Sequence, residues 1–286
     1  MPGSEGRSGW LLRSAPSAID ATPAFLRLYQ RARREPRWFP PALLDCVFLI
    51  VPGLFTERYP LYFFQNKNRM KQLGIDAREV PMKTELPVAA CAAAVRDAIL
   101  RAAPRQSILV AHSKGPLDAH AALVLYPETV PHVRALVSLQ APFGGTPLAS
   151  DEGRLLRRLI SGTIRGLFGG APQSFFDLSY DARERFLQAH GATCPVPAIS
   201  LVTTTARAAW PLEHTRRYLH RTYRVKSDGF VPEGDAAIPG SRLVRLEGVD
   251  HAGLALRWLG RSLFEPAPLT QAILALVEER PDGRAS

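Results

Sequence analysis

The sequence predicts an α/β fold built on a mostly parallel, doubly wound sheet. Three observations support this prediction. Short apolar runs alternate with helical stretches of ten or more residues, which is the pattern of parallel strands joined by crossover helices. Two of the runs, at 46–51 and near 107–111, are apolar almost throughout, as buried parallel strands are. The chain has 286 residues, 46% of them hydrophobic, enough for one large domain with a substantial core.

The individual elements follow in chain order. A helix begins at Thr22-Pro23, where an N-cap residue precedes a proline in the first turn. Strands are expected at 46–51, 75–82, 107–111, 133–139, 198–204 and 242–246, and further helices at 61–73, 87–103, 116–125 and 269–279. Residues 1–21 are small and polar, so we expect them to form a flexible lead-in to a domain that spans 22–286.

One stretch interrupts the alternation. No clear strand is visible from about 142 to 190, which is long for a connection and indicates a helical, lid-like insertion. Leucine and isoleucine recur there at helical spacing over 154–168, with arginines between them. Two interpretations stay open. The segment is either a helix packed on the core, or an amphipathic lid that covers an acyl pocket and contacts a lipid surface transiently.

The net charge of +10 comes almost entirely from arginine, because only five of the 36 basic residues are lysines. The basic residues are spread along the chain and are not interleaved with aromatic residues. We therefore expect no nucleic-acid partner. Two explanations of the charge stay open, namely solvated arginines on ordinary outer faces, and a basic surface that attracts anionic lipid or an acidic substrate.

The cysteines and the N-terminus further narrow the class of protein. Cys46, Cys91 and Cys194 are odd in number and include no C-x-x-C spacing, so neither a disulfide framework nor a zinc site is indicated. We expect no metal and no cofactor. The N-terminus lacks the apolar region of a secretory signal, and no apolar run approaches the length of a membrane span. A soluble cytoplasmic protein is the expectation.

A nucleophile is indicated at Ser113. It lies in A-H-S-K-G, directly after one predicted strand and directly before a predicted helix. A serine in such a tight turn has a strained backbone, and the residues two before and two after it have to be small, as Ala111 and Gly115 are. The turn exposes the hydroxyl and directs a helix N-terminus towards it, which favours developing negative charge. A purely structural serine in a strand–helix turn is the alternative.

A serine hydroxyl needs a base, and the base needs an acid that orients it. In sites of this type the chain order is serine, acid, histidine. Of the seven histidines only His251, in G-V-D-H-A-G-L after the last predicted strand, has that position. Asp228, in K-S-D-G-F-V-P, is the expected acid. Asp235 and Asp151 stay as alternatives, whereas Asp250 is too close in sequence to reach around its neighbour.

Two backbone N–H groups are expected to form an oxyanion hole. Lys114, directly after the serine, supplies one of them. In V-P-G-L-F-T-E-R-Y-P, Gly53 permits a bend and the N–H of Leu54 is the candidate for the other. The side chain of Lys114 is expected either to favour an anionic substrate or to turn outward. His112, inside the turn, is expected to point away from the site.

With these residues placed, the sequence resembles the lipase-like α/β-hydrolases. The resemblance covers about 38–251 and rests, in order, on V-P-G-L-F-T-E-R-Y-P-L-Y-F, H-S-K-G, L-D-A, Q-A-P-F-G-G-T-P-L-A-S-D, L-S-Y-D-A-R, K-S-D-G-F-V-P, I-P-G-S and D-H-A. It implies an α/β-hydrolase fold with Ser113, Asp228 and His251 as the catalytic triad. The sequence departs from many lipases at Pro52, where they carry histidine before the glycine.

The expected activity is that of a carboxylic-ester hydrolase of the esterase or lipase type, acting on a small-molecule or lipid ester. Ser113 would attack the ester carbonyl, His251 would move the proton, and Asp228 would orient the histidine. An acyltransferase or thioesterase would use the same three residues through the same acyl-enzyme. A non-catalytic module of the same fold that binds a ligand or partner is an alternative from a different class.

Overall fold

The computed structural model describes residues 7–13, 18–54, 56, 59, 61–150, 173–256 and 259–279. Its strands are β1 (Ile19–Asp20), β2 (Val47–Val51), β3 (Asp76–Glu79), β4 (Ser107–His112), β5 (Val133–Leu139), β6 (Ala198–Thr204) and β7 (Arg242–Glu247). Within the described residues they form one seven-stranded sheet in the order β1-β7-β6-β5-β4-β2-β3. Every neighbouring pair is parallel. The predicted fold class is therefore confirmed.

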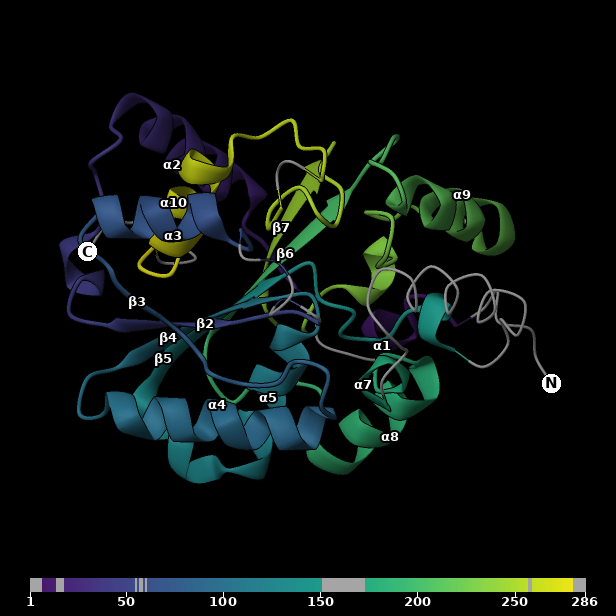
Figure 1. Cartoon of the computed structure of the whole chain (residues 1–286), viewed down its shortest axis with the longest axis horizontal. Coiled ribbons are helices and arrows are strands. Elements are labelled where there is room, and N and C mark those ends of the chain that lie inside the picture. Colours follow the sequence, from purple (N-terminus) through teal and green to yellow (C-terminus); the bar gives the residue numbers. More distant parts are fainter. Residues whose placement is uncertain are drawn as a thin grey trace.

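Helices cover both faces of the sheet (Figure 1). The described helices are α1 (Trp10–Arg13), α2 (Thr22–Arg34), α3 (Phe64–Gln72), α4 (Val88–Ala102), α5 (Gly115–Leu125), α7 (Gln173–Phe176), α8 (Tyr180–His190), α9 (Leu212–Tyr223) and α10 (Pro266–Ala275). Figure 1 shows α2, α3 and α10 on one face, and α4 and α5 on the other. Because both faces are covered, β2 and β4 are buried at every position, which explains their continuous apolar sequences.

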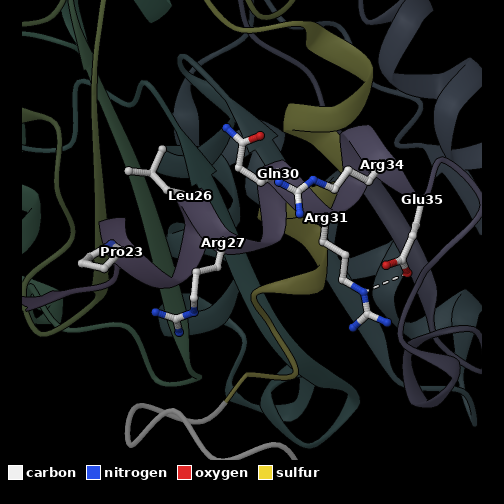
Figure 2. A pocket seen from close by; sticks show the side chains of 7 residues that line it. All are labelled: Pro23, Leu26, Arg27, Gln30, Arg31, Arg34 and Glu35. Atoms are coloured by element: carbon white, nitrogen blue, oxygen red, sulfur yellow. Dashed lines mark hydrogen bonds and ion pairs between the residues drawn. The ribbon is translucent and has the colours of Figure 1, made fainter.

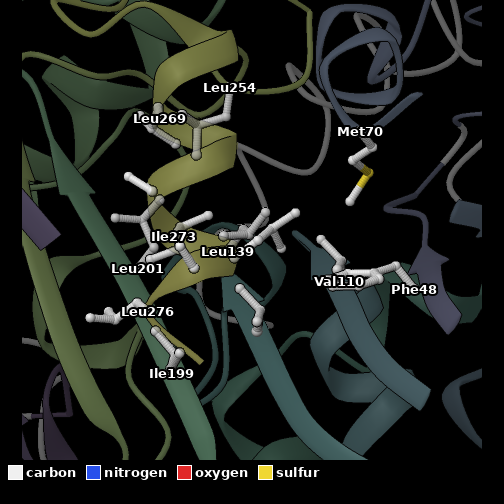
Figure 3. Close-up of a cluster of buried hydrophobic side chains, with 14 of the residues drawn as sticks. Phe48, Met70, Val110, Leu139, Ile199, Leu201, Leu254, Leu269, Ile273 and Leu276 are labelled. Atoms are coloured by element: carbon white, nitrogen blue, oxygen red, sulfur yellow. The ribbon is translucent and has the colours of Figure 1, made fainter. Parts of the chain in front are cut away.

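The hydrophobic core lies in two layers, one on each side of the sheet. In the layer shown in Figure 3, Ile273 of α10 lies with Leu139 of β5 and Leu201 of β6 in one cluster of buried side chains. On the opposite face, Val95 of α4 and Leu109 of β4 belong to a second cluster. The sheet lies between these two layers, and the loops at the carboxyl ends of its parallel strands share one edge.

The described part of the N-terminal segment packs against the domain. Trp10 donates a hydrogen bond from Nε1 to the carbonyl of Gly144 at 2.8 Å, and the N–H of Gly9 donates to Asp235 Oδ1 at 2.7 Å. Strand β1 adds to the edge of the sheet beside β7. Residues 7–13 and 18–20 therefore contact the domain in this structure, and the flexibility expected of residues 1–21 stays a prediction. Composition alone did not reveal the acceptors, which lie more than a hundred residues away in sequence.

The insertion predicted at 142–190 is only partly described. Its end forms α8, which begins where the Ser179 hydroxyl accepts a hydrogen bond from the N–H of Ala182 at 3.3 Å. The insertion was expected to be helical, and α8 is a helix within it, but no bounds were predicted for this helix because its arginines and acids obscure the apolar positions. The amphipathic stretch 154–168, proposed above as a lid, lies outside the described residues.

The surface is rich in arginine–carboxylate pairs. Arg105 and Arg78 both pair with Asp76, at 2.6 and 2.7 Å, and Arg31 pairs with Glu35 at 3.0 Å.

An open groove runs along α2 (Figure 2). It is lined by Pro23, Leu26, Arg27, Gln30, Arg31, Arg34 and Glu35. Among the described residues, no helix is long and apolar enough to cross a membrane.

Candidate active site

Ser113 lies in a tight turn between β4 and α5. Its φ of 60° is in the left-handed region, which an L-residue adopts only under strain. The N–H of Ser113 donates to the carbonyl of Leu139, at the end of the neighbouring strand β5, at 3.0 Å. This hydrogen bond anchors the strained turn to the sheet and holds the hydroxyl at the carboxyl edge.

The turn has no room for larger side chains at its flanking glycines. A Cβ atom on Gly115 would lie 2.3 Å from the carbonyl oxygen of Val51, and one on Gly53 would lie 3.0 Å from Ser113 Cβ. The requirement for a small residue two positions after the serine is thereby explained by the close approach of β2. The same closeness places the loop that contains Gly53 directly beside the serine.

Three side chains from separate loops form a continuous hydrogen-bonded row. His251 Nε2 lies 2.9 Å from Ser113 Oγ, and His251 Nδ1 lies 2.8 Å from Asp228 Oδ2. The N–H of His251 also donates to the backbone carbonyl of Asp228 at 2.9 Å. Because Nδ1 faces a carboxylate, it carries the ring proton, which leaves Nε2 free to accept the proton of the serine hydroxyl.

The row is largely shielded from water. The side chain of Asp228 is 1% exposed and that of His251 is 12% exposed. Asp228 Oδ1 accepts hydrogen bonds from the N–H groups of Phe230 and Val231, at 2.9 and 2.8 Å, so that only Oδ2 is directed at the histidine. The ring of Phe230 lies 4.9 Å from the imidazole, centroid to centroid, and covers one side of it.

The alternative acids are engaged elsewhere. Asp235 accepts hydrogen bonds from the N-terminal segment and from the hydroxyl of Tyr180, at 2.8 Å for the latter. Asp250 accepts from the N–H groups of Ala209 and Arg261, at 2.8 and 2.9 Å. Asp151 lies outside the described residues. Of the described candidates, Asp228 is the carboxylate that contacts His251.

Comparison with solved structures identifies the fold to which this chain belongs. No protein-family model matches the sequence, and no curated protein sequence matches it significantly. A crystal structure of a metagenomic carboxyl esterase superposes with a TM-score of 0.74 at 21% identity, covering 97% of this chain and 96% of that one. The chain has the α/β-hydrolase fold.

Two further structures agree with this assignment of the α/β-hydrolase fold. The mature lipase BlEst2 from Bacillus licheniformis gives a TM-score of 0.65 at 18% identity, covering 84% of this chain and 94% of that one. A lipase from Staphylococcus hyicus gives 0.59 at 10% identity, covering 84% and 98%. These neighbours agree with the lipase-like resemblance of the sequence.

The side chain of Lys114 corrects both sequence-based expectations for it. It neither faces the serine side of the turn nor points into solvent, because its Nζ is buried against Asp118 at 2.7 and 2.9 Å and against Cys91 Sγ at 3.3 Å. Both members of the ion pair have fully buried side chains. Burial opposes the charge on Lys114, but Asp118 and Cys91 outweigh it and hold its pKa above the usual value. Lys114 therefore pairs with α5 in the interior beneath the turn of this α/β-hydrolase fold.

We expect Lys114→Met to lower the free energy of unfolding by about 3–5 kcal/mol, because it leaves the Asp118 carboxylate buried without its cation. Denaturant unfolding followed by circular dichroism measures this loss. The matched control is the double variant Lys114→Met/Asp118→Leu, which removes both charges and should recover most of the stability. A single variant that unfolds at the same denaturant concentration as the wild type would contradict this account of the pair.

Sequence reasoning missed three buried residues beside the row formed by Ser113, His251 and Asp228. His112, expected to point away, contacts the His251 loop, with its Nε2 3.3 Å from the carbonyl of His251. Tyr62 and Gln140 are its other hydrogen-bond partners, at 3.1 and 3.2 Å. Both lie in segments that carry the family resemblance, but no spacing rule links them, because the contacts form only between loops of different strands.

The predicted oxyanion donors both lie beside the serine. Lys114 follows it directly, and Leu54 follows Gly53, which approaches Ser113 Cβ closely. Among the described residues, neither the N–H of Leu54 nor that of Lys114 has a hydrogen-bond acceptor. Within the same part of the chain, no group of three or more histidine, cysteine or carboxylate side chains is arranged to hold a metal ion.

Proposed function

We propose that this protein is a serine hydrolase that cleaves carboxylic esters through an acyl-enzyme on Ser113. The observation that carries the proposal is the hydrogen-bonded row from Ser113 through His251 to Asp228, with distances of 2.9 and 2.8 Å. A base within hydrogen-bond reach of a hydroxyl, and itself oriented by a buried carboxylate, is the arrangement that activates serine as a nucleophile.

The proposed reaction has two stages. Ser113 Oγ attacks the ester carbonyl while His251 Nε2 takes its proton, and the histidine then protonates the departing alcohol. Water next attacks the acyl-enzyme, with the histidine again taking a proton and returning it to Oγ as the acid leaves. Asp228 stays ionised throughout and stabilises the imidazolium that forms in each stage.

We assign the backbone N–H groups of Leu54 and Lys114 to the oxyanion hole. Two arguments support this assignment. The N–H of Lys114 lies at the N-terminal end of α5, where helix geometry leaves donors without partners. In the facing loop, the N–H of Gly53 is already engaged with Tyr62 Oη at 3.1 Å, so that the next donor along the chain, that of Leu54, is the one available.

An ester is the proposed substrate because the structural neighbours are described as a carboxyl esterase and lipases. An acyltransferase or thioesterase would form the same acyl-enzyme and differ only in the donor or in the acceptor. The neighbours favour water as the acceptor. We also keep the lid proposal for 142–190, in which the apolar face of 154–168 covers the acyl pocket.

Release of p-nitrophenol from p-nitrophenyl esters of short, medium and long acyl chains tests the proposed function. We expect the purified protein to hydrolyse at least one ester of the series, with a saturable dependence on its concentration. A p-nitrophenyl thioester and an added alcohol acceptor, run in parallel, distinguish thioesterase and transferase activity. A folded protein that hydrolyses none of the esters faster than buffer would contradict the proposal.

A further inference from the structure

A chain of buried hydrogen bonds runs behind the triad, from the Gly53 loop to the His251 loop. The N–H of Gly53 donates to Tyr62 Oη at 3.1 Å, and Tyr62 Oη lies 3.1 Å from His112 Nδ1. On the other side of the ring, His112 Nε2 lies 3.2 Å from Gln140 Oε1 and 3.3 Å from the carbonyl of His251. Tyr62, His112 and Gln140 are each at most 5% exposed. They are called the Tyr62–His112–Gln140 chain below.

The direction of this chain is fixed at the Gln140 end. Gln140 Nε2 lies 3.0 Å from the carbonyl of Asp250, which can only accept a hydrogen bond, so the amide nitrogen must be on that side. The amide oxygen of Gln140 therefore faces His112 Nε2, and that nitrogen has to carry the ring proton. His112 Nδ1 is then an acceptor, and the hydroxyl of Tyr62 donates to it.

Burial keeps both rings in the protonation states that this direction requires. Burial, followed by the nearby His251, lowers the pKa of His112 to about 3, so the imidazole is neutral over the range in which proteins are stable. Burial raises the pKa of Tyr62 above its ordinary value, so its hydroxyl keeps the proton that it donates. No charged state interrupts the chain at neutral pH.

The two ends of the Tyr62–His112–Gln140 chain contact the two backbone segments on which the proposed chemistry depends. One end holds Gly53, whose position sets where the N–H of Leu54 points. The other end holds two successive carbonyls, those of Asp250 and His251, and thereby the loop that carries the imidazole. The backbone is also strained where Gln140 contacts the His251 loop, because Gln140 has a φ of 53°.

We propose that Tyr62, His112 and Gln140 are positioning residues, which hold the oxyanion loop and the catalytic histidine loop in register with each other on either side of Ser113. This inference rests on the proposed function and extends it. No hydrogen bond joins the three side chains to Ser113 Oγ or to the ring nitrogens of His251, although the His112 ring lies 5.2 Å from the His251 ring, centroid to centroid. They act through the backbone of Gly53 and of His251, and a small displacement of either segment lowers the rate of the chemical step more than it lowers binding.

The first test is Tyr62→Phe, which removes one hydroxyl and leaves the ring in place. We expect kcat for a p-nitrophenyl ester to fall about ten-fold, with KM changed less than about two-fold, because transition-state stabilisation is lost and ground-state binding is kept. The matched control is Tyr180→Phe. It removes an equally buried hydroxyl, bonded to Asp235 at 2.8 Å, from outside the site, and should leave kcat unchanged. Equal values of kcat in the two variants would overturn the inference.

Substitution of the ring itself provides a rescue experiment. His112→Gln keeps one acceptor towards Tyr62 and one donor towards Gln140, whereas His112→Leu keeps neither. We expect the glutamine variant to retain about ten-fold more activity per folded molecule than the leucine variant. Equal activities would indicate that His112 only fills space, and would contradict the positioning role.

A measurement on the unaltered protein covers the case in which the variants do not fold. The ¹⁵N chemical shifts of the histidine rings report which nitrogen carries the proton. We expect His112 to be neutral with the proton on Nε2 between pH 5 and 8, the range spanned by an ordinary histidine titration. A proton on Nδ1, or a titration within that range, would overturn the inference.

These experiments distinguish failure of the positioning inference from failure of the proposed function. If the wild type hydrolyses no ester, the proposed function fails, whereas the tautomer of His112 is measured independently of activity. If the wild type is active but Tyr62→Phe and Tyr180→Phe have the same kcat, the proposed function stands and the positioning inference fails.

Discussion

Ser113→Ala is expected to lower kcat for ester hydrolysis by about 10⁶-fold, the scale seen when a serine nucleophile is removed from a triad. The reason is that the hydroxyl 2.9 Å from His251 Nε2 is the group that we propose to form the acyl-enzyme. With alanine in its place, only binding and the oxyanion donors contribute, and these leave a small residual rate over water. Initial rates on the best p-nitrophenyl ester measure the loss.

Ser138→Ala is the matched control for this substitution. Ser138 lies in β5, in register beside Ala111 of β4, and its buried hydroxyl has no hydrogen-bond partner among the described residues. Its removal should leave kcat within about two-fold of the wild type, because surrounding packing changes by one atom. A Ser113→Ala protein that kept more than about a hundredth of the wild-type rate would assign the nucleophile to another residue.

Asp228→Asn is expected to lower kcat by about 10⁴-fold while the fold is kept. Oδ1 of Asp228 accepts from two backbone N–H groups, those of Phe230 and Val231, so the amide oxygen of asparagine has to take that place. The amide nitrogen then faces His251 and donates to Nδ1. The ring proton moves to Nε2, which faces the serine, and the histidine can no longer act as the base.

Asp235→Asn separates this effect from the loss of any buried carboxylate. Asp235 lies in the same loop, is 1% exposed, and was the alternative acid on sequence grounds. Its partners are Gly9, Ser8 and Tyr180, not His251. We expect kcat per active site to be unchanged in this variant. Loss of kcat in Asp235→Asn, together with retention of kcat in Asp228→Asn, would show that Asp235 and not Asp228 is the acid.

The features that were predicted from sequence depend on local order along the chain. The strands at 133–139 and 198–204 have the predicted bounds, because both are rich in apolar residues and are buried at six of their seven positions between the two helical layers. The proximity of Ser113, Asp228 and His251 follows from the same logic, since each lies at the carboxyl end of the sheet. In a parallel sheet those ends share one edge, so the order of elements is enough to bring loops together.

The features that were not predicted depend on which direction a side chain takes once the fold is formed. Lys114 follows the serine directly, yet its side chain enters the core and pairs with Asp118. The proximity of Tyr62, His112 and Gln140 requires the last residue of β4 to meet the segments that follow β2 and β5. Similarly, α1 and β1 are held by partners that are far away in the chain, which local composition does not indicate.

The most direct test of the central claim is covalent labelling with a fluorophosphonate, which reacts with an activated serine and stops at the phosphonyl adduct. We expect the wild type to gain one adduct, and peptide mapping by mass spectrometry to place it on Ser113. The Ser113→Ala variant should gain none. Equal labelling of both proteins, or an adduct mapped to any other residue, would contradict the assignment of Ser113 as the nucleophile.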